Sequence, residues 1–466
     1  MHLLHFGDFL TRIDIKPCRT IEAIRETIKR EAELRPDAPR LLCKGWYQDV
    51  TPALASLLDD LDPRPIYCDS HDLHQTWCNT AALKELGVED MKDPAGGEIA
   101  RDADGRPTGL LSEAAAVTIV WPFIARVAPR ETKFTQIREA LKSYSAAGYT
   151  TFADLATDEA SWQSLLDFRA KDDFPLRFAA YWIINPRDTD EEMLSQVDKA
   201  IEMHKRYNRK DSPDFWINGI KVICDGVVDG CTAALTDPYS HNGAQIDPLW
   251  KQSSLLKVVQ KASTAGLQCA LHAIGDKAIT MAIDVLSATG TKDSRGRIEH
   301  LELCSAKDSL RLAEHGIIAS VQPVHSDPAV LPAWPQLIGT DRCKRAFAYG
   351  EFHSNGATLA FGTDSPTALH FPFPNLYNAT TRRSAVKLEM KEKTNEEFKV
   401  GLFDAVTAYT KGASYALFAD DRVGTIEVGK KADFTIADMQ WDPETLLQAV
   451  VHETWIRGKR VFQKER

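Results

Sequence analysis

Three residues in the second half of the chain combine the side-chain types and positions that bind divalent metals. His272 in ALHAIGD, His300 in RIEHLEL and Asp364 in FGTDSP each stand at or near the end of an apolar, strand-like run. Imidazole nitrogen and carboxylate oxygen together suit borderline metals such as zinc. A single histidine in such a place is more often a hydrogen-bonded core or loop residue, but two histidines ending consecutive strands point to the same edge of a sheet. The set therefore predicts a metal site.

Lys221 lies in a fourth run, between two aliphatic residues of INGIKVICDG. A buried ammonium is costly unless it is paired or neutralised. One interpretation is a lysine that reaches an acid such as Asp225 or Asp229. The other is a lysine carboxylated by CO₂, which would bridge two metal ions that activate a shared hydroxide. Asp364 would then act as the general base, and afterwards as the acid toward a leaving amine.

The elements that would position these residues alternate between short β-rich runs and amphipathic helical stretches, such as 189–208 and 249–266. Strand–helix–strand alternation implies parallel pairing with helices outside. A (β/α)₈ barrel needs eight strands, and a doubly wound sheet is the competing architecture. The number of units and the polar residues at strand ends favour a distorted α/β barrel over residues 121–414. Seven strands are predicted, at 149–156, 176–184, 215–224, 267–274, 297–303, 317–324 and 357–364.

Three other regions depart from this alternation. Residues 21–120 are predicted to be an inserted α/β region that covers the barrel mouth, with a hairpin or loop at GGEIARDADGRPTGLL. Residues 415–466 contain short β-rich runs split by glycine turns, predicted to be part of a β-sandwich subdomain that must pack on something else. Residues 1–20 are predicted to hold a remnant of the first barrel strand, with Met1-His2 as its stub, and the segment that follows it.

Composition excludes several classes of partner. The net charge of −10 is spread along the 466 residues, which argues against nucleic acid or an anionic membrane surface. No apolar run approaches the roughly 20 residues that span a bilayer, and the N-terminus lacks the basic and apolar regions of a signal peptide. Nine cysteines form no CxxC pair and no disulfide framework. We therefore expect a cytoplasmic protein with a small-molecule substrate, and a homodimer remains open.

An ordered set of motifs along nearly the whole chain resembles the metal-dependent amidohydrolase superfamily, in the branch of N-substituted formamide deformylase (amidohydrolase family 3). Each motif alone is weak, and the specificity comes from their order. The motifs are TWCNTAAL, GGEIARDADGRPTGLL, GIKVICDG, LHAIGD, RIEHLEL, VQPVHS, FGTDSP and GTIEVGKKADFTIAD.

The resemblance implies a distorted TIM barrel with a metal centre at the strand ends and a β-sandwich built from both ends of the chain. It implies hydrolysis of the C–N bond of a small, N-substituted amide with one or two divalent ions, zinc first and Mn²⁺ or Fe²⁺ as alternatives. His2 would be the second histidine of a His-x-His pair, Lys221 the carboxylated bridging ligand, and His272 and His300 ligands of the more buried ion. Asp364 would be both a ligand and the proton shuttle.

The sequence departs from this pattern at its start. The first histidine of the pair, most of the first barrel strand and the N-terminal half of the sandwich have no counterpart before His2. Every later motif is present, so the pattern looks like an N-terminal truncation. We expect this chain to bind at most one metal ion tightly and to have little activity.

Five further residues are candidates for substrate contact. Gln322 and His325 follow the seventh predicted strand, and Asp225 follows Lys221 closely. Trp46 and His71 lie in the predicted insertion. For each of them, ordinary packing or surface hydrogen bonding explains the residue equally well.

Two other functions remain as alternatives. One is a catalytically impaired relative that binds or regulates. The other is a deaminase-type amidohydrolase, against which Lys221 counts, because deaminases of this superfamily generally use one metal and no lysine bridge.

Overall fold

The computed structural model describes residues 2–71, 74–94, 97–290 and 292–465. Contacts divide the chain into two compact units. One consists of Leu4–Glu139, and the other of Ala140–Arg466 with Met1–Leu3. Among the described helices, none has both the length and the apolar character that a membrane crossing requires.

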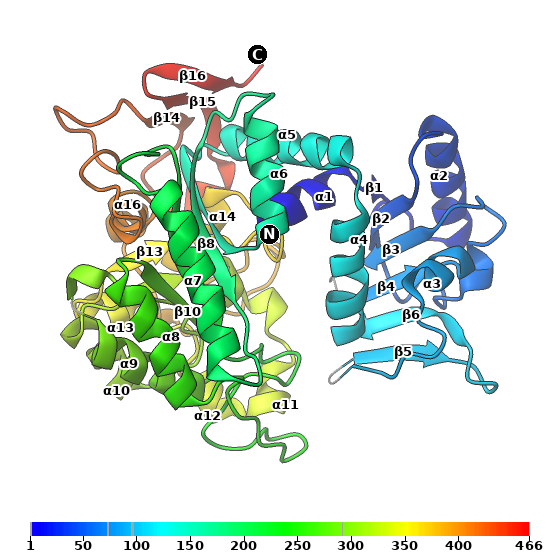
Figure 1. Ribbon diagram of the computed structural model, residues 1–466, viewed down its shortest axis with the longest axis horizontal. Coiled ribbons are helices and arrows are strands. Elements are labelled where there is room, and N and C mark those ends of the chain that lie inside the picture. Colours follow the sequence, from blue (N-terminus) through cyan, green and yellow to red (C-terminus); the bar gives the residue numbers. More distant parts are fainter. Residues whose placement is uncertain (1, 72–73, 95–96, 291, 466) are drawn as a thin grey trace. The chain divides into compact units, whose positions relative to one another are not determined.

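The larger unit contains a seven-stranded sheet in which every pairing is parallel (Figure 1). The spatial order β13-β12-β11-β10-β9-β8-β7 follows the chain without reversal. A doubly wound sheet would reverse its order at a switch point, so the predicted distorted α/β barrel is confirmed, in the form of a curled, parallel half-barrel sheet. The strands are β7 Thr151–Thr157, β8 Arg177–Ile184, β9 Phe215–Ile223, β10 Gln268–Ala273, β11 Arg297–His300, β12 Ile318–Val321 and β13 Leu359–Phe361.

Helices follow most of these strands, as the alternation predicts. In α7, Thr189 and Glu192 form a capping box, and Met193, Val197 and Ala200 are buried at helical spacing. The helices of this part are α6 Glu159–Arg169, α7 Asp190–Arg206, α8 Gln252–Thr264, α9 Asp276–Thr289, α10 Ala306–Glu314, α11 Trp334–Ile338, α12 Thr340–Cys343, α13 Tyr349–Ser354, α14 Pro372–Thr381, α15 Leu402–Thr407 and α16 Ala413–Ala416.

The predicted stub of a first barrel strand is wrong, because His2–Thr11 forms an α-helix, α1. Leu3 is 1% exposed, Phe6 is 3% exposed, and Gly7 is also buried. These positions have the i, i+3, i+4 spacing of one helix face, which a strand would place on alternating sides. Helix formation therefore places these three positions together on one buried face.

The unit Leu4–Glu139 is built on a six-stranded sheet of order β1-β2-β3-β4-β6-β5. The predicted hairpin in GGEIARDADGRPTGLL is confirmed, because β5 and β6 pair in antiparallel. That this unit covers the barrel mouth stays a prediction. Its strands are β1 Ile13–Asp14, β2 Leu41–Trp46, β3 Ile66–Ser70, β4 Gln75–Cys78, β5 Gly97–Arg101 and β6 Pro107–Glu113, and its other helices are α2 Ile21–Leu34, α3 Thr80–Leu86, α4 Trp121–Val127 and α5 Arg130–Ala146, which runs past Glu139.

The C-terminal segment forms a three-stranded antiparallel sheet from β14 Phe434–Asp438, β15 Val450–Ile456 and β16 Lys459–Gln463. The predicted short β-strands are thus present after residue 415, although 425–428 forms none and Ile426 is 92% exposed. The Thr454 hydroxyl donates to the Ser145 carbonyl at 2.7 Å. This contact fastens the small sheet to the segment before β7, since three strands alone are marginal.

Candidate metal centre

Strand register brings Lys221, His272 and His300 to the same end of the sheet. Lys221 pairs with Ala270, and His300 pairs with Ala273. Carboxyl ends of parallel strands meet at one edge, so the ends of β9, β10 and β11 form one surface. The predicted alignment of these residues on consecutive strands is therefore present.

Lys221 is only 5% exposed. Burial lowers the pKa of its ammonium, and the negative charges of Glu299 and Asp364 act against that shift. A lowered pKa increases the fraction of neutral amine, the form that adds to CO₂. Carboxylation of Lys221 stays a prediction.

The rings of His272 and His300 lie 4.4 Å apart between centroids in an edge-to-face arrangement. Burial, with Lys221 as a further cause, lowers the pKa of His272 to about 3. Burial followed by His272 lowers the pKa of His300 well below its usual range. Both imidazoles are therefore neutral at pH 7, the form that binds metals.

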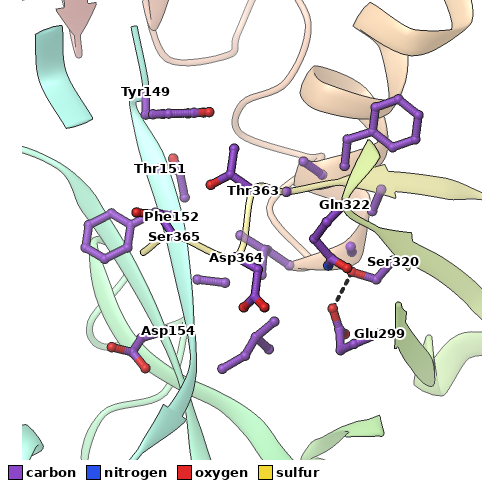
Figure 2. Close-up of a pocket in the computed structure, with 18 of the residues that line it drawn as sticks. Tyr149, Thr151, Phe152, Asp154, Glu299, Ser320, Gln322, Thr363, Asp364 and Ser365 are labelled. Atoms are coloured by element: carbon purple, nitrogen blue, oxygen red, sulfur yellow. Dashed lines mark hydrogen bonds between the residues drawn. The ribbon is translucent and has the colours of Figure 1, made fainter. Parts of the chain in front are cut away.

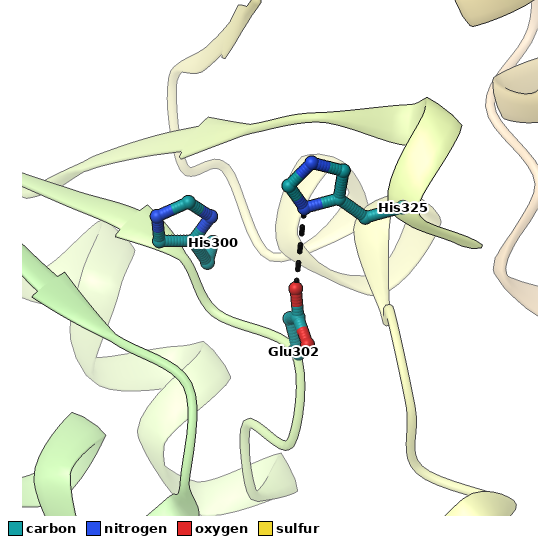
Figure 3. A group of neighbouring side chains, drawn as sticks. All are labelled: His300, Glu302 and His325. Atoms are coloured by element: carbon teal, nitrogen blue, oxygen red, sulfur yellow. Dashed lines mark hydrogen bonds and ion pairs between the residues drawn. The ribbon is translucent and has the colours of Figure 1, made fainter. Parts of the chain in front are cut away.

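A third imidazole, from His325, stacks on His300 with ring centroids 5.7 Å apart. His325 Nδ1 lies 3.3 Å from Glu302 Oε1, as Figure 3 shows. The ligand atoms of His300, Glu302 and His325 all lie within 4.8 Å of one another. Burial alone would lower the pKa of His325, but the hydrogen bond and charge of Glu302 raise it. These three residues offer a compact N/O donor set.

Sequence reasoning missed Glu302. It stands two residues after His300 in RIEHLEL, where strand alternation would suggest the same face. However, β11 ends at His300, and both His300 (φ 77°) and Leu301 (φ 53°) have left-handed backbone. The chain turns there, so Glu302 reaches the histidines by a bend that no periodicity encodes.

Asp364 follows β13 in left-handed backbone (φ 57°) and lines a cavity beside the sheet (Figure 2). Its negative charge acts on Lys221, His272 and His325. The Thr367 hydroxyl donates to Asp364 Oδ2 at 3.2 Å. The structure therefore brings the carboxylate into the electrostatic range of the histidines.

Asp225 is fully buried and accepts three backbone hydrogen bonds, from Ile274 (3.0 Å), Gly275 (2.8 Å) and Ala234 (2.9 Å). Burial raises its pKa to about 7 against these donors. One Asp225 oxygen also lies 3.6 Å from His272 Nε2. The hydrogen-bond partner of His272 Nε2 is the Gly226 carbonyl oxygen at 3.4 Å, and Asp225 lies beside it.

The remaining predicted site residues lie in different surroundings. Gln322 is 5% exposed and lines the same cavity as Asp364. Trp46 is buried on β2 of the smaller unit and pairs with Trp77 at 5.6 Å. His71, in the same unit, is exposed and lies 4.7 Å from the Tyr47 ring. The side chain of His2 lies outside the described residues.

The donor set fits a divalent ion. His300 Nδ1 is buried and makes no hydrogen bond, although a buried polar atom without a partner is costly. Neutral imidazoles and carboxylates in one cluster are the ligands that zinc, manganese and iron accept. Bound metal would satisfy that nitrogen and would balance the acids around it.

Comparison with other proteins gives a consistent result. The model of the amidohydrolase family, Amidohydro_3, matches residues 1–462. Protein LONG AFTER FAR-RED 3 of Arabidopsis thaliana is 29% identical over 99% of this chain and 80% of that protein. N-substituted formamide deformylase of Arthrobacter pascens is 23% identical over 82% of this chain and 70% of that enzyme.

Among solved structures, an uncharacterized metal-dependent hydrolase from Pyrococcus horikoshii has the same fold. Its TM-score is 0.76 at 24% identity, with 93% of this chain and 82% of that chain covered. Three observations agree on one family: the parallel half-barrel, the cluster of histidines and carboxylates at its strand ends, and the family match over nearly the whole length. The chain belongs to the amidohydrolase family of metal-dependent hydrolases.

Proposed function

We propose that this chain hydrolyses the C–N bond of a small, N-substituted amide with a bound divalent ion, zinc first and Mn²⁺ or Fe²⁺ as alternatives. The observation that carries the proposal is the pair His272 and His300, whose rings lie 4.4 Å apart between centroids and whose pKa values are lowered, first of all by burial. The partial identity with N-substituted formamide deformylase supports this substrate class.

Lys221, His272 and His300 would hold the ion, with Lys221 carboxylated, and Asp364 would complete the ligand set. Glu302 and His325 offer further donors beside His300. A bound divalent ion supplies a Lewis acid that polarises the amide carbonyl and lowers the pKa of water. Asp225, held by three backbone N–H groups, lies beside the His272 ring.

Asp364 accepts a proton on its carboxylate and returns it to the leaving nitrogen. Its position after β13, beside a cavity and within electrostatic range of His272, supports this role. His325 and Gln322, from the turn after β12, would hydrogen-bond to the amide. Trp46, His71 and Asp225 are further candidates for contact with the substrate.

The test is a hydrolysis assay with a panel of N-substituted formamides and acyl amines. The purified chain is dialysed against chelator, then given zinc or manganese with bicarbonate. We expect amine release that depends on the metal. The assay also includes cyclic amidines, and ammonia release from these alone would support the deaminase alternative instead.

Two matched pairs of variants make the assay specific. Asp364→Asn should abolish most activity, whereas Asp341→Asn, at an exposed acid on α12, should leave it unchanged. His300→Asn should abolish activity, whereas His315→Asn, at the exposed end of α10, should not. Amine release by the unsubstituted chain that persists in both site variants would contradict the proposal. Absence of turnover with metal bound would favour the binding or regulatory alternative.

A further inference from the structure

His300 lies between two other histidines that come from opposite sides of its strand. Strand β11, which ends at His300, has β10 on one side and β12 on the other. The β10 side contributes His272, whose ring meets that of His300 edge to face. The β12 side contributes His325, from the turn that follows that strand, and its ring is stacked on His300. His300 therefore belongs to two groups of side chains.

The side chains around His300 offer more donors than one zinc ion takes. Structural zinc sites almost always have four ligands, and catalytic ones have three protein ligands with a water. The ligands proposed above already reach that number, so Glu302 and His325 are additional to them. Together with His300, they make a set of two imidazoles and one carboxylate. That set by itself holds zinc in known catalytic sites.

His300, Glu302 and His325 have nearly the spacing of ligands on a single ion (Figure 3). Two ligands at a tetrahedral angle on zinc lie about 3.4 Å apart, because each bond is about 2.1 Å long. His325 Nδ1 and Glu302 Oε1 lie 3.3 Å apart. No two of the three ligand atoms are separated by more than 4.8 Å. The widest separation therefore has to close by at most about 1.4 Å, which rotation of the side chains can supply.

The segments that carry the two additional donors are held by backbone hydrogen bonds. The Glu302 carbonyl accepts from the Phe347 N–H at 2.8 Å. His325 lies in the 3₁₀ turn Pro323–Ser326, where its N–H donates to the Gln322 carbonyl at 2.9 Å. The side chain of Glu302 is 8% exposed and that of His325 is 19% exposed. The cluster is thus ordered before an ion binds, and it is open to solvent at His325.

Negative charge gathers around Glu302. Burial raises the pKa of its carboxyl, and the charges of Asp229 and Asp364 raise it further, whereas His325 lowers it. Asp229 Oδ2 accepts a hydrogen bond from the indole N–H of Trp334 at 3.1 Å. A divalent cation beside Glu302 would be attracted by all three carboxylates.

We propose that His300, Glu302 and His325 form a metal position of their own for a divalent ion of the zinc type. This position needs neither Lys221 nor His272. Because His300 belongs to both positions, they are alternatives for one ion, and an ion held by Glu302 and His325 empties the position at Lys221 and His272. The inference concerns binding and is independent of the proposed hydrolysis.

The test removes the other position and asks whether the chain still binds metal. The full chain with Lys221→Met and His272→Asn is treated with chelator and titrated with Zn²⁺ in a calorimeter. We expect one ion per chain. Adding Glu302→Gln or His325→Asn should weaken binding by more than about tenfold, because loss of a residue that only orients a ligand already costs about 10–100-fold in metal affinity. Titration with Co²⁺, whose visible absorption depends on its ligands, should show a spectrum that these two changes abolish.

Glu314 and His315 provide the matched control, because they are an exposed pair of the same residue types at the end of α10. Glu314→Gln and His315→Asn in the same background should leave the affinity and the cobalt spectrum unchanged. Circular dichroism shows whether each variant is folded. If the doubly substituted chain does not fold, His272→Asn alone in buffer freed of bicarbonate takes its place, since an uncarboxylated lysine is then the only change still needed at Lys221.

Two results would overturn the inference. One is a folded chain with the first position removed that binds no ion. The other is binding that persists with equal affinity after both Glu302→Gln and His325→Asn. In either case Glu302 and His325 would be an ordinary hydrogen-bonded pair. Turnover is not measured in this titration, so its outcome and that of the hydrolysis assay can differ.

Discussion

The middle and the edges of the parallel sheet differ in how completely their polar groups are satisfied. In the middle, Arg297 of β11 donates to Glu299, to Tyr181 of β8 and to Ser320 of β12. At one edge, Thr151 of β7 carries a buried hydroxyl oxygen that makes no hydrogen bond. Middle strands thus share a polar network around Arg297, whereas the edge strands border a cavity.

This difference bears on the metal site. Lys221, His272 and His300 lie on strands β9, β10 and β11, each of which has a strand on both sides. Asp364 follows β13, at an edge. The three proposed ligands therefore lie on strands that are supported on both sides, while Asp364, the proposed proton carrier, lies at an edge of the sheet. Binding of metal and turnover should respond differently to changes in the two regions.

The largest expected effect is on kcat, and a substitution at Asp364 separates turnover from metal binding. Asp364→Asn removes the proposed proton carrier but leaves Lys221, His272 and His300 in place. General acid–base groups contribute about 10²–10⁴-fold to rate, so kcat should fall by about that factor. Metal analysis of the same sample should still find the bound ion. A variant with unchanged kcat would contradict the assignment of Asp364.

A large loss of stability is expected from a substitution in the middle of the sheet. Arg297→Met would leave Glu299, which is 1% exposed, without its cation. Breaking a buried ion pair by removing one partner costs about 3–5 kcal/mol. Urea unfolding should show this loss. If unfolding is unchanged, the network does not stabilise the middle strands.

The histidine pair should make the metal-free protein sensitive to acid. Burial keeps His272 neutral down to a pKa of about 3, whereas an unfolded histidine takes up a proton near pH 6.5. Its contribution is present above pH 6.5 and is lost progressively as the pH falls. Between pH 7.5 and 5.5 the free energy of unfolding should fall by about 1.4 kcal/mol in total for each of His272 and His300. Urea unfolding between pH 7.5 and 5.5 measures this slope, and His272→Asn should reduce it.

The smallest expected effects are on stability, and they come from removing one hydroxyl in the middle of the sheet and one at its edge. Ser320→Ala removes hydrogen bonds with Glu299 and Arg297, and bonds to charged groups contribute about 1.5–3 kcal/mol. Thr151→Val replaces an unpaired buried hydroxyl with a methyl group of similar shape, so the protein should be unchanged or stabilised by up to about 1 kcal/mol. Thermal unfolding of both variants gives the comparison. Equal destabilisation would show that the two regions do not differ.

The strands could be predicted from the sequence because each is a short apolar run that ends in a turn or a polar residue. All seven predicted strands are present, and Lys221, His272 and His300 lie together as expected. Periodicity gives the elements, and parallel pairing then places their carboxyl ends together.

Other features had no local signal. The turn that brings Glu302 to His325 depends on left-handed backbone at His300 and Leu301, a conformation that is uncommon for residues other than glycine. The segment at His2 was predicted as a strand from its place in a family pattern. Its apolar spacing at Leu3, Phe6 and Gly7 indicates a helix instead. In this segment, the periodicity of the apolar residues predicts the structure better than the resemblance to a family does.

The most direct test of the account is the metal content of the dialysed protein by elemental analysis. We expect one tightly bound divalent ion per chain in the unsubstituted protein and in the control His315→Asn. His300→Asn should hold none, because it removes a buried nitrogen ligand from the middle of the sheet. An unsubstituted protein that binds no ion after incubation with zinc and bicarbonate, or a His300→Asn variant that retains it, would contradict the account.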